Sequence, residues 1–207
     1  PISLTPWMYS KIKKGDIRSM RKVLQLLSIV VVGIAVALML ISPELVLIFG
    51  SPKYREAVYV IPPVAASVFF IFIYNILSMP QFYYEKTQFL MAASMAAAGA
   101  NVVLNFIFIR LFGYIAAGYT TLACYMLYSV GHYIVSKRIL VNEGIQENLM
   151  NPGFLVACSV FLIGASIICN LIFPYRILRY AILLASAGLV FWKKELLLKT
   201  MADIRKK

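Results

Sequence analysis

Six long apolar segments constrain the fold of this chain more than any other feature of the sequence. They cover residues 23–42, 58–79, 88–109, 114–136, 154–173 and 177–192. A helix that crosses a bilayer needs about 20 mostly apolar residues, whereas a strand of a membrane barrel alternates polar and apolar residues over about ten positions. No such alternation is present in the sequence. The segments therefore predict an all-α polytopic membrane protein with about six transmembrane helices.

The composition supports the same class of protein. Hydrophobic residues make up 62% of the chain and charged residues 14%, whereas soluble domains are about 45–50% apolar and about 25% charged. The net charge is +12, but the basic residues form short clusters between apolar segments. This distribution is typical of residues that flank membrane helices, so we expect no nucleic-acid partner. Cys124, Cys158 and Cys169 lie inside apolar segments without paired spacing, which indicates neither a disulfide framework nor a metal site.

The basic residues also predict an orientation. Alternate connections, at 11–22, 80–87, 137–152 and after residue 192, hold fifteen of the 20 lysines and arginines. The positive-inside rule then places both ends of this chain in the cytoplasm. The predicted organisation is a basic cytoplasmic segment at 1–22, four transmembrane helices within 23–136, a cytoplasmic linker at 137–153, a terminal transmembrane hairpin at 154–192 and a basic tail at 193–207. Because the chain begins at Pro1 without a signal peptide, we expect it to be a piece of a longer protein.

Two of the apolar segments carry polar residues on one face. In 88–109, Asn101 and Asn105 lie four residues apart and share an arc of about 60° with small residues. In 114–136 the stripe spans about 100° and consists of Gly118, Thr121, Tyr125, Tyr128, Ser129, His132 and Ser136. Such faces either bind neighbouring helices together or line a polar path, and the two alternatives are compatible. The candidates for a substrate path are Asn101, Asn105, Thr121, Tyr125, Tyr128 and His132.

Three further residue types carry specific expectations. His132, the single histidine, is either a proton-sensitive group or an interfacial histidine bonded to a neighbour. Pro62 and Pro63 fall inside the segment 58–79, where missing backbone donors would kink the helix and make it a candidate hinge. Arg179 lies near the end of the last apolar segment and would have to extend its side chain to the interface.

Enzyme signatures are missing from the sequence. It contains no HExxH, no glycine-rich phosphate loop and no CxxC, and it offers no Ser/His/Asp arrangement. We therefore expect no catalytic residue, no metal and no cofactor. Of the eight acidic residues, Glu44 alone adjoins an apolar segment. Proton- and sodium-driven carriers usually need buried carboxylates, which argues against a coupling site in this chain.

One stretch resembles a known family. "NVVLNFIFIRLFGYIAAGYTTLACYMLYSVGHYIVSKRI" (101–139) is similar to bacterial oligosaccharide flippases of the O-antigen type, polysaccharide biosynthesis proteins in the superfamily that also contains multidrug exporters. The shared pattern is an asparagine pair, an outer turn at Gly113, a run of alanines with "TT", and then "HY" before a basic end. "TPWMYSKIKKGD" (5–16) and "ELVLIFGSPKYREA" (44–57), with an outer-turn motif at Tyr54, extend the resemblance. Arg110 departs from it, because the family often has proline there.

The resemblance implies that this chain is the carboxy-terminal part of a two-repeat transporter with twelve to fourteen helices in the bacterial inner membrane. It further implies that the protein flips undecaprenyl-diphosphate-linked oligosaccharide from the inner to the outer leaflet by alternating access, for cell-surface polysaccharide assembly. The implied partners are the bilayer, the lipid-linked oligosaccharide, the missing amino-terminal half, a polysaccharide polymerase and glycosyltransferases. Three alternatives remain open: a six-helix scaffold for envelope glycosyltransferases, a multidrug exporter of the same superfamily, and an enzyme acting on polyprenyl phosphates.

Overall fold

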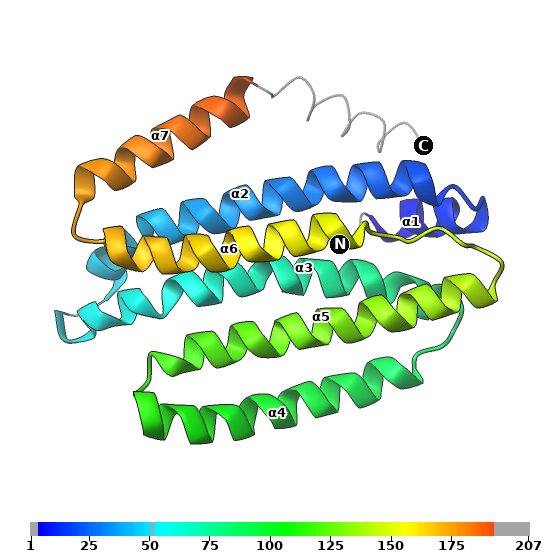
Figure 1. The fold of residues 1–207 in the computed structure, drawn as a ribbon, viewed down its shortest axis with the longest axis horizontal. Coiled ribbons are helices and arrows are strands. Elements are labelled where there is room, and N and C mark those ends of the chain that lie inside the picture. The colour runs from blue at the N-terminus through cyan, green and yellow to red at the C-terminus, as the bar shows by residue number, and fades with distance from the viewer. Residues whose placement is uncertain (1–3, 51, 193–207) are drawn as a thin grey trace.

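The computed structural model describes residues 4–50 and 52–192, and helices account for all the regular structure within them (Figure 1). The elements are α1 (Thr5–Lys13), α2 (Ile17–Phe49), the 3-10 helix η1 (Pro52–Tyr59), α3 (Ile61–Tyr83), α4 (Gln88–Phe112), α5 (Ala116–Asn142), α6 (Pro152–Ile172) and α7 (Arg176–Trp192). The prediction of an all-α chain is confirmed for this part of the protein. The predicted basic tail at 193–207 and residues 1–3 lie outside the described residues.

Four of the helical spans are long and apolar enough to cross a membrane: α2, residues 55–83 of η1 and α3, α4, and α6. The sequence predicted about six transmembrane helices, and four helical spans in the described ranges are long and apolar enough to be such helices. Helix α5 has 27 residues but is more polar because of its stripe, and α7 has 17. Helix α2 has 33 residues, more than the predicted 23–42. Its length of about 50 Å exceeds the hydrocarbon core of about 30 Å, so its basic first turns extend the helix beyond the apolar segment.

Helix α3 occupies the middle of the bundle. It packs against α5, α2 and α6, and its buried side chains include Phe69, Ile73 and Leu77. Helix α4 packs mainly on α5 at one edge of the molecule, and none of its residues is buried (Figure 1). Helix α7 lies at the opposite edge, against α2 and α6. The order of the helices across the bundle leaves α4 with one long face that no described helix covers.

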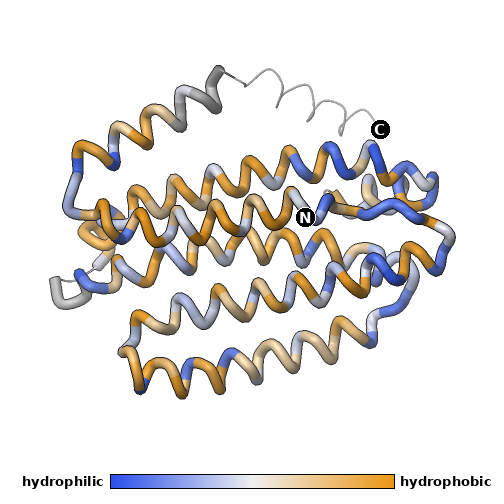
Figure 2. The backbone as a smooth tube through the Cα atoms, in the orientation of Figure 1, coloured by the Kyte–Doolittle hydropathy of each residue, from blue (hydrophilic) through white to orange (hydrophobic). Residues whose placement is uncertain are grey.

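The three basic connections that the structure describes, at 11–22, 80–87 and 137–152, lie at one end of the bundle (Figures 1 and 2). Two ion pairs join them. Arg21 Nη2 lies 3.3 Å from a carboxylate oxygen of Glu147, and Lys86 Nζ lies 3.0 Å from one of Glu143. The start of α2, the α3–α4 turn and the α5–α6 linker therefore meet. The assignment of this end to the cytoplasm stays a prediction.

The prolines occupy different positions from those expected. Pro62 and Pro63 lie in the first turn of α3, where backbone N–H groups have no intrahelical acceptor, and not in the interior of a helix. The predicted mid-helix kink at these residues is wrong, because the structure ends η1 at Tyr59 and begins α3 at Ile61. The prolines inside helices are Pro43 of α2 and Pro80 of α3.

Pro43 leaves the Met39 carbonyl, four residues earlier, without an amide donor, and one side chain donates to it instead. Ser42 Oγ donates to the Met39 carbonyl at 2.7 Å, and Arg179 Nη1 donates to the Leu40 carbonyl at 2.7 Å. The same guanidinium holds both carboxylate oxygens of Glu44 at 2.8 Å. Arg179 is 3% exposed, so it does not extend to the interface as the sequence suggested. Its ion pair instead ties α7 to α2.

Candidate functional site

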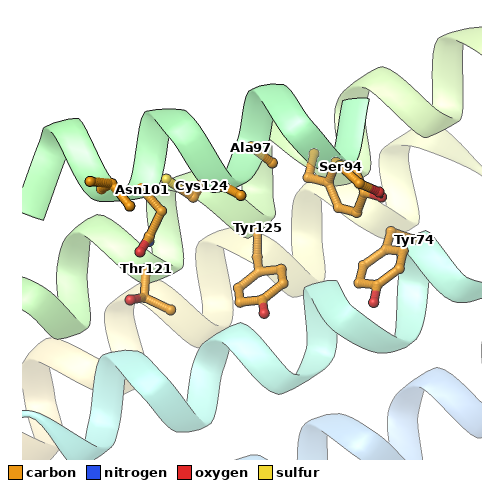
Figure 3. Close-up of a pocket in the computed structure, with 10 residues that line it drawn as sticks. Tyr74, Ser94, Ala97, Asn101, Thr121, Cys124 and Tyr125 are labelled. Carbon is orange, nitrogen blue, oxygen red and sulfur yellow. The ribbon is translucent and has the colours of Figure 1, made fainter. Parts of the chain in front are cut away.

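The predicted polar faces of α4 and α5 meet at a cavity of about 450 Å³, which α3 closes from below (Figure 3). Its lining residues are Tyr74 of α3; Ser94, Ala97, Ala98, Asn101 and Val102 of α4; and Thr121, Cys124, Tyr125 and Tyr128 of α5. Four of the six predicted substrate-path residues, Asn101, Thr121, Tyr125 and Tyr128, belong to this set. Their i, i+3 and i+4 spacing explains the grouping, because such residues share one side of a helix.

Three tyrosines form the aromatic part of the cavity wall. The rings of Tyr74 and Tyr125 are nearly parallel, with an interplanar angle of 6° and a centroid distance of 6.3 Å. The Tyr128 ring lies 4.7 Å from that of Tyr74. The Tyr128 hydroxyl and the Ser94 hydroxyl are hydrogen bonded at 2.7 Å, which connects α5 to α4. The cavity therefore combines aromatic faces with hydroxyl groups.

Asn105 does not line the cavity, but it positions Asn101. Its Nδ2 donates to Asn101 Oδ1 at 2.9 Å, and its own Oδ1 accepts from Thr120 Oγ1 at 2.5 Å. The sequence left open whether these asparagines bind helices together or face a polar path. The structure divides the two roles: Asn105 joins α4 to α5, and Asn101 presents its amide at the cavity. No hydrogen bond joins the Thr121 or Tyr125 hydroxyl to another described residue, so both can bind a ligand.

His132 lies behind the cavity wall and is fully buried. Its Nδ1 is 2.7 Å from Nε2 of Gln81, which is also fully buried. An amide donor at Nδ1 corresponds to the neutral tautomer with its proton on Nε2. The ring packs edge-on against Tyr128, at 4.5 Å and 90°. Of the two roles considered for His132, this geometry is that of a histidine bonded to a neighbouring helix.

The outer-turn residues lie at the end of the bundle opposite the basic connections. Gly113 joins α4 to α5 with a φ of 78°, a conformation that residues with a Cβ rarely adopt. Tyr54 belongs to η1. A hydrogen bond of 3.3 Å from the Tyr114 hydroxyl to Glu56 brings the two turns together. Pro63 contributes to the same end, because Gly118 of α5 packs directly against it.

Among the hydroxyl- and amide-bearing residues of this region, sequence reasoning missed three as site candidates: Tyr74, Ser94 and Gln81. Ser94 belongs to the same arc as Asn101, so the helical periodicity contained the signal. Tyr74 and Gln81 share one face of α3 with Ser67 and Ser78, at spacings of seven, four and three residues, so the helical periodicity contained a signal here too. Only the packing of α3 against α5 shows that they face Tyr125, Tyr128 and His132.

The cavity can bind a neutral polar ligand. None of the ten lining residues is charged, so a charged ligand would find no ion-pair partner there. No group of histidine, cysteine and acidic residues with metal-binding geometry occurs in the described ranges. Comparisons with protein-family models, with curated proteins and with solved structures found no match to this chain.

Proposed function

We propose that this chain is part of a membrane transporter that flips undecaprenyl-diphosphate-linked oligosaccharide from the inner to the outer leaflet of the bacterial inner membrane. The transporter would have two repeats of six helices with a terminal hairpin and would work by alternating access. The observation that carries the proposal is the uncharged, hydroxyl- and tyrosine-lined cavity between α3, α4 and α5. The sequence resemblance described above supports the same function.

The chemistry of the cavity suits a sugar. A sugar brings many hydroxyl groups, and each one that leaves water without a hydrogen-bond partner costs free energy. The Asn101 amide and the Thr121 and Tyr125 hydroxyls supply such partners. The tyrosine rings supply apolar faces for the ring carbons. A cationic drug would instead need an acidic partner, and none lines this cavity.

Helix α4 forms one wall of the cavity, and its outer face is covered by no described helix. In the proposed transporter the other repeat supplies the opposite wall. No lysine or arginine lines the cavity, so the groups that bind the diphosphate belong to that other repeat. In this proposal the glycosyltransferases build the lipid-linked oligosaccharide before it is flipped, and the polymerase uses it afterwards.

The test is a flipping assay in membrane vesicles from cells that depend on the native protein. Lipid-linked oligosaccharide in the outer leaflet is quantified by its accessibility to an added glycosidase. Asn101→Leu and Tyr125→Leu should each lower the flipping rate about fivefold or more, since an unpaired sugar hydroxyl costs about 1–3 kcal/mol. Ser28→Ala, which removes a hydroxyl of α2 that lies outside the cavity and bonds only to the Leu24 carbonyl of its own helix, is the control and should leave the rate unchanged.

Two outcomes would overturn the proposal. If both cavity variants flip oligosaccharide at the wild-type rate but lose efflux of a cationic dye, the cavity belongs to a drug exporter. If depletion of the protein lowers surface polysaccharide while flipping continues at full rate, the protein is a scaffold for the glycosyltransferases.

A further inference from the structure

A second concave site, an apolar groove, lies on the other side of α5, between α5 and α6 with α3 as its floor. Its volume is about 380 Å³. Phe69, Phe70 and Ile73 of α3 form the buried floor. The rims carry exposed valines: Val130 of α5 is 55% exposed, and Val156 and Val160 of α6 are 62% and 66% exposed. The groove is therefore open along its length and apolar on both rims.

The two serines of the groove are already hydrogen bonded to the backbone, which leaves the Tyr133 hydroxyl, at the end nearest the basic residues, as the groove's other polar side-chain group. Ser129 Oγ donates to the carbonyls of Phe70 at 3.0 Å and Tyr125 at 2.8 Å, and Ser159 Oγ donates to that of Leu155 at 2.8 Å. Their donors are thus turned away from an incoming ligand. A sugar would gain little here, whereas a hydrocarbon chain loses nothing by occupying such a surface.

A second pocket continues the groove toward the basic end of the bundle. Tyr133 lines both, and the second pocket also contains Lys137 and Arg138. Both basic side chains are exposed. The two acidic residues of the adjoining linker bind elsewhere: Glu143 pairs with Lys86, and Glu147 with Arg21. In the described part of the chain, neither Lys137 nor Arg138 has an ion pair or a side-chain hydrogen bond.

The length of the groove matches one leaflet. Its α6 wall runs from Pro152 to Ile163, which is about 17 Å along a helix at about 1.5 Å per residue. Half of a hydrocarbon core of about 30 Å is about 15 Å. A chain in the groove would thus extend from the level of the basic pair to about the middle of the bilayer.

We propose that an anionic phospholipid of the bilayer occupies this groove. One acyl chain lies between α5 and α6 over the floor of α3, and the phosphate binds Lys137 and Arg138. Two basic side chains without an ion-pair partner lie at the mouth of an apolar groove that is one leaflet deep. Their charge is complementary to an anionic headgroup, and this combination selects an anionic phospholipid as the ligand. The site is separate from the cavity on the other side of α5 and does not depend on the proposed flipping function.

The test is native mass spectrometry of the native protein in detergent, with phosphatidylglycerol and phosphatidylcholine at equal concentration. The wild type should retain phosphatidylglycerol preferentially. K137Q/R138Q should lower that retention about fivefold for each charge removed, or about 25-fold in total. K13Q/K14Q is the matched control: Lys13 and Lys14 are also exposed neighbours at the basic end but do not line the groove. It should change retention less than twofold.

A second variant tests the apolar half of the site. Val156→Trp fills the open rim and should lower phosphatidylglycerol retention about as much as K137Q/R138Q does. Unchanged retention in Val156→Trp, or equal losses in K13Q/K14Q and K137Q/R138Q, would mean general surface adsorption and would overturn the proposal. Displacement of phosphatidylglycerol by a tenfold lower concentration of undecaprenyl phosphate would also overturn it, because the groove would then belong to an isoprenoid carrier.

Discussion

The cavity between α3, α4 and α5 and the groove between α3, α5 and α6 share two helices and differ in where their hydroxyl groups point. In the cavity, the hydroxyls of Tyr128 and Ser94 bond to each other across two helices, and those of Thr121 and Tyr125 have no partner among the described residues. In the groove, Ser129 and Ser159 bond to backbone carbonyls. Residue type alone therefore does not decide whether a concave surface is polar. What decides it is whether each hydroxyl is bonded back to the backbone of its own helix or is left to face the concave surface.

The comparison also shows how one helix serves two ligands. Helix α5 presents Thr121, Tyr125 and Tyr128 to one side and Met126 and Val130 to the other. Both surfaces depend on the same docking of α5 against α3. A change that moves α5 should therefore disturb both sites, and a change on one face should disturb only one.

The largest effect is expected where α5 and α3 touch most closely. A Cβ on Gly118 would lie 2.8 Å from Pro63 Cγ and 2.9 Å from the Val60 carbonyl oxygen. Gly118→Leu should lower the free energy of unfolding by about 3 kcal/mol through overpacking, and it should weaken both ligand sites. The measurement is a thermal or detergent unfolding curve together with both binding assays.

Gly99→Ala is the control for this prediction, because a Cβ on Gly99 meets nothing within 4 Å. It should leave both sites intact and raise stability by up to about 1 kcal/mol through helix propensity. If Gly118→Leu lost only the cavity and kept the lipid, the two sites would not share the docking of α5.

The next effect concerns the contact that supports the cavity from behind. His132→Leu should cost about 2 kcal/mol, because the buried Gln81 amide loses its partner on α5 and keeps only its bond to the Leu77 carbonyl of its own helix. Replacing both residues, as Gln81→Leu with His132→Leu, should recover most of that loss, since neither polar group is then left unpaired. Unfolding curves of the two single variants and the double variant measure the coupling. Losses that simply add would show that the two side chains do not interact.

A smaller effect distinguishes the two kinds of hydroxyl directly. Tyr128→Phe removes the hydrogen bond to Ser94 between α5 and α4, and interhelical bonds of this kind are worth about 0.6 kcal/mol. Ser159→Ala removes a bond within one turn of α6 and should change the free energy of unfolding by less than that. A double-mutant cycle of Tyr128→Phe with Ser94→Ala gives the interaction energy. Equal costs for Tyr128→Phe and Ser159→Ala would remove the distinction between the two regions.

The smallest effect lies outside both regions, in the α1–α2 turn. Hydrogen bonds, chiefly from Lys11 and then from Ser19, lower the pKa of Asp16 from 3.8 to about 2. Because this pKa is lower in the folded protein, the stabilisation by Asp16 is present above about pH 4 and is lost as the pH falls to about 2. Melting temperatures measured between pH 4 and pH 2 should fall less steeply for Asp16→Asn than for the wild type. An unchanged slope would show that Asp16 does not contribute.

Much of the fold was predictable because helical periodicity and membrane helix length leave direct marks in the sequence. The helix boundaries were predicted less accurately. Helix α2 begins at Ile17 and not at residue 23, because the arginines and the lysine of the basic segment favour helix as readily as the apolar residues do. The stripes of α4 and α5 identified four cavity residues. Pro62 and Pro63 were misplaced, because an apolar run does not show that a 3-10 helix ends just before them.

By itself, the sequence determined the all-helical class, the apolar spans and the polar faces of α4 and α5, because these depend on local spacing and composition. Only the tertiary structure decided that Tyr74 completes the cavity, that Gln81 binds His132 and that Arg179 joins Glu44. These contacts join residues 51 to 135 positions apart in the chain. No local pattern specifies such pairs, since the packing of the helices in the bundle brings them together. Which neighbour each side of α5 meets was set in the same way: α4 adjoins the polar side and α6 adjoins the groove.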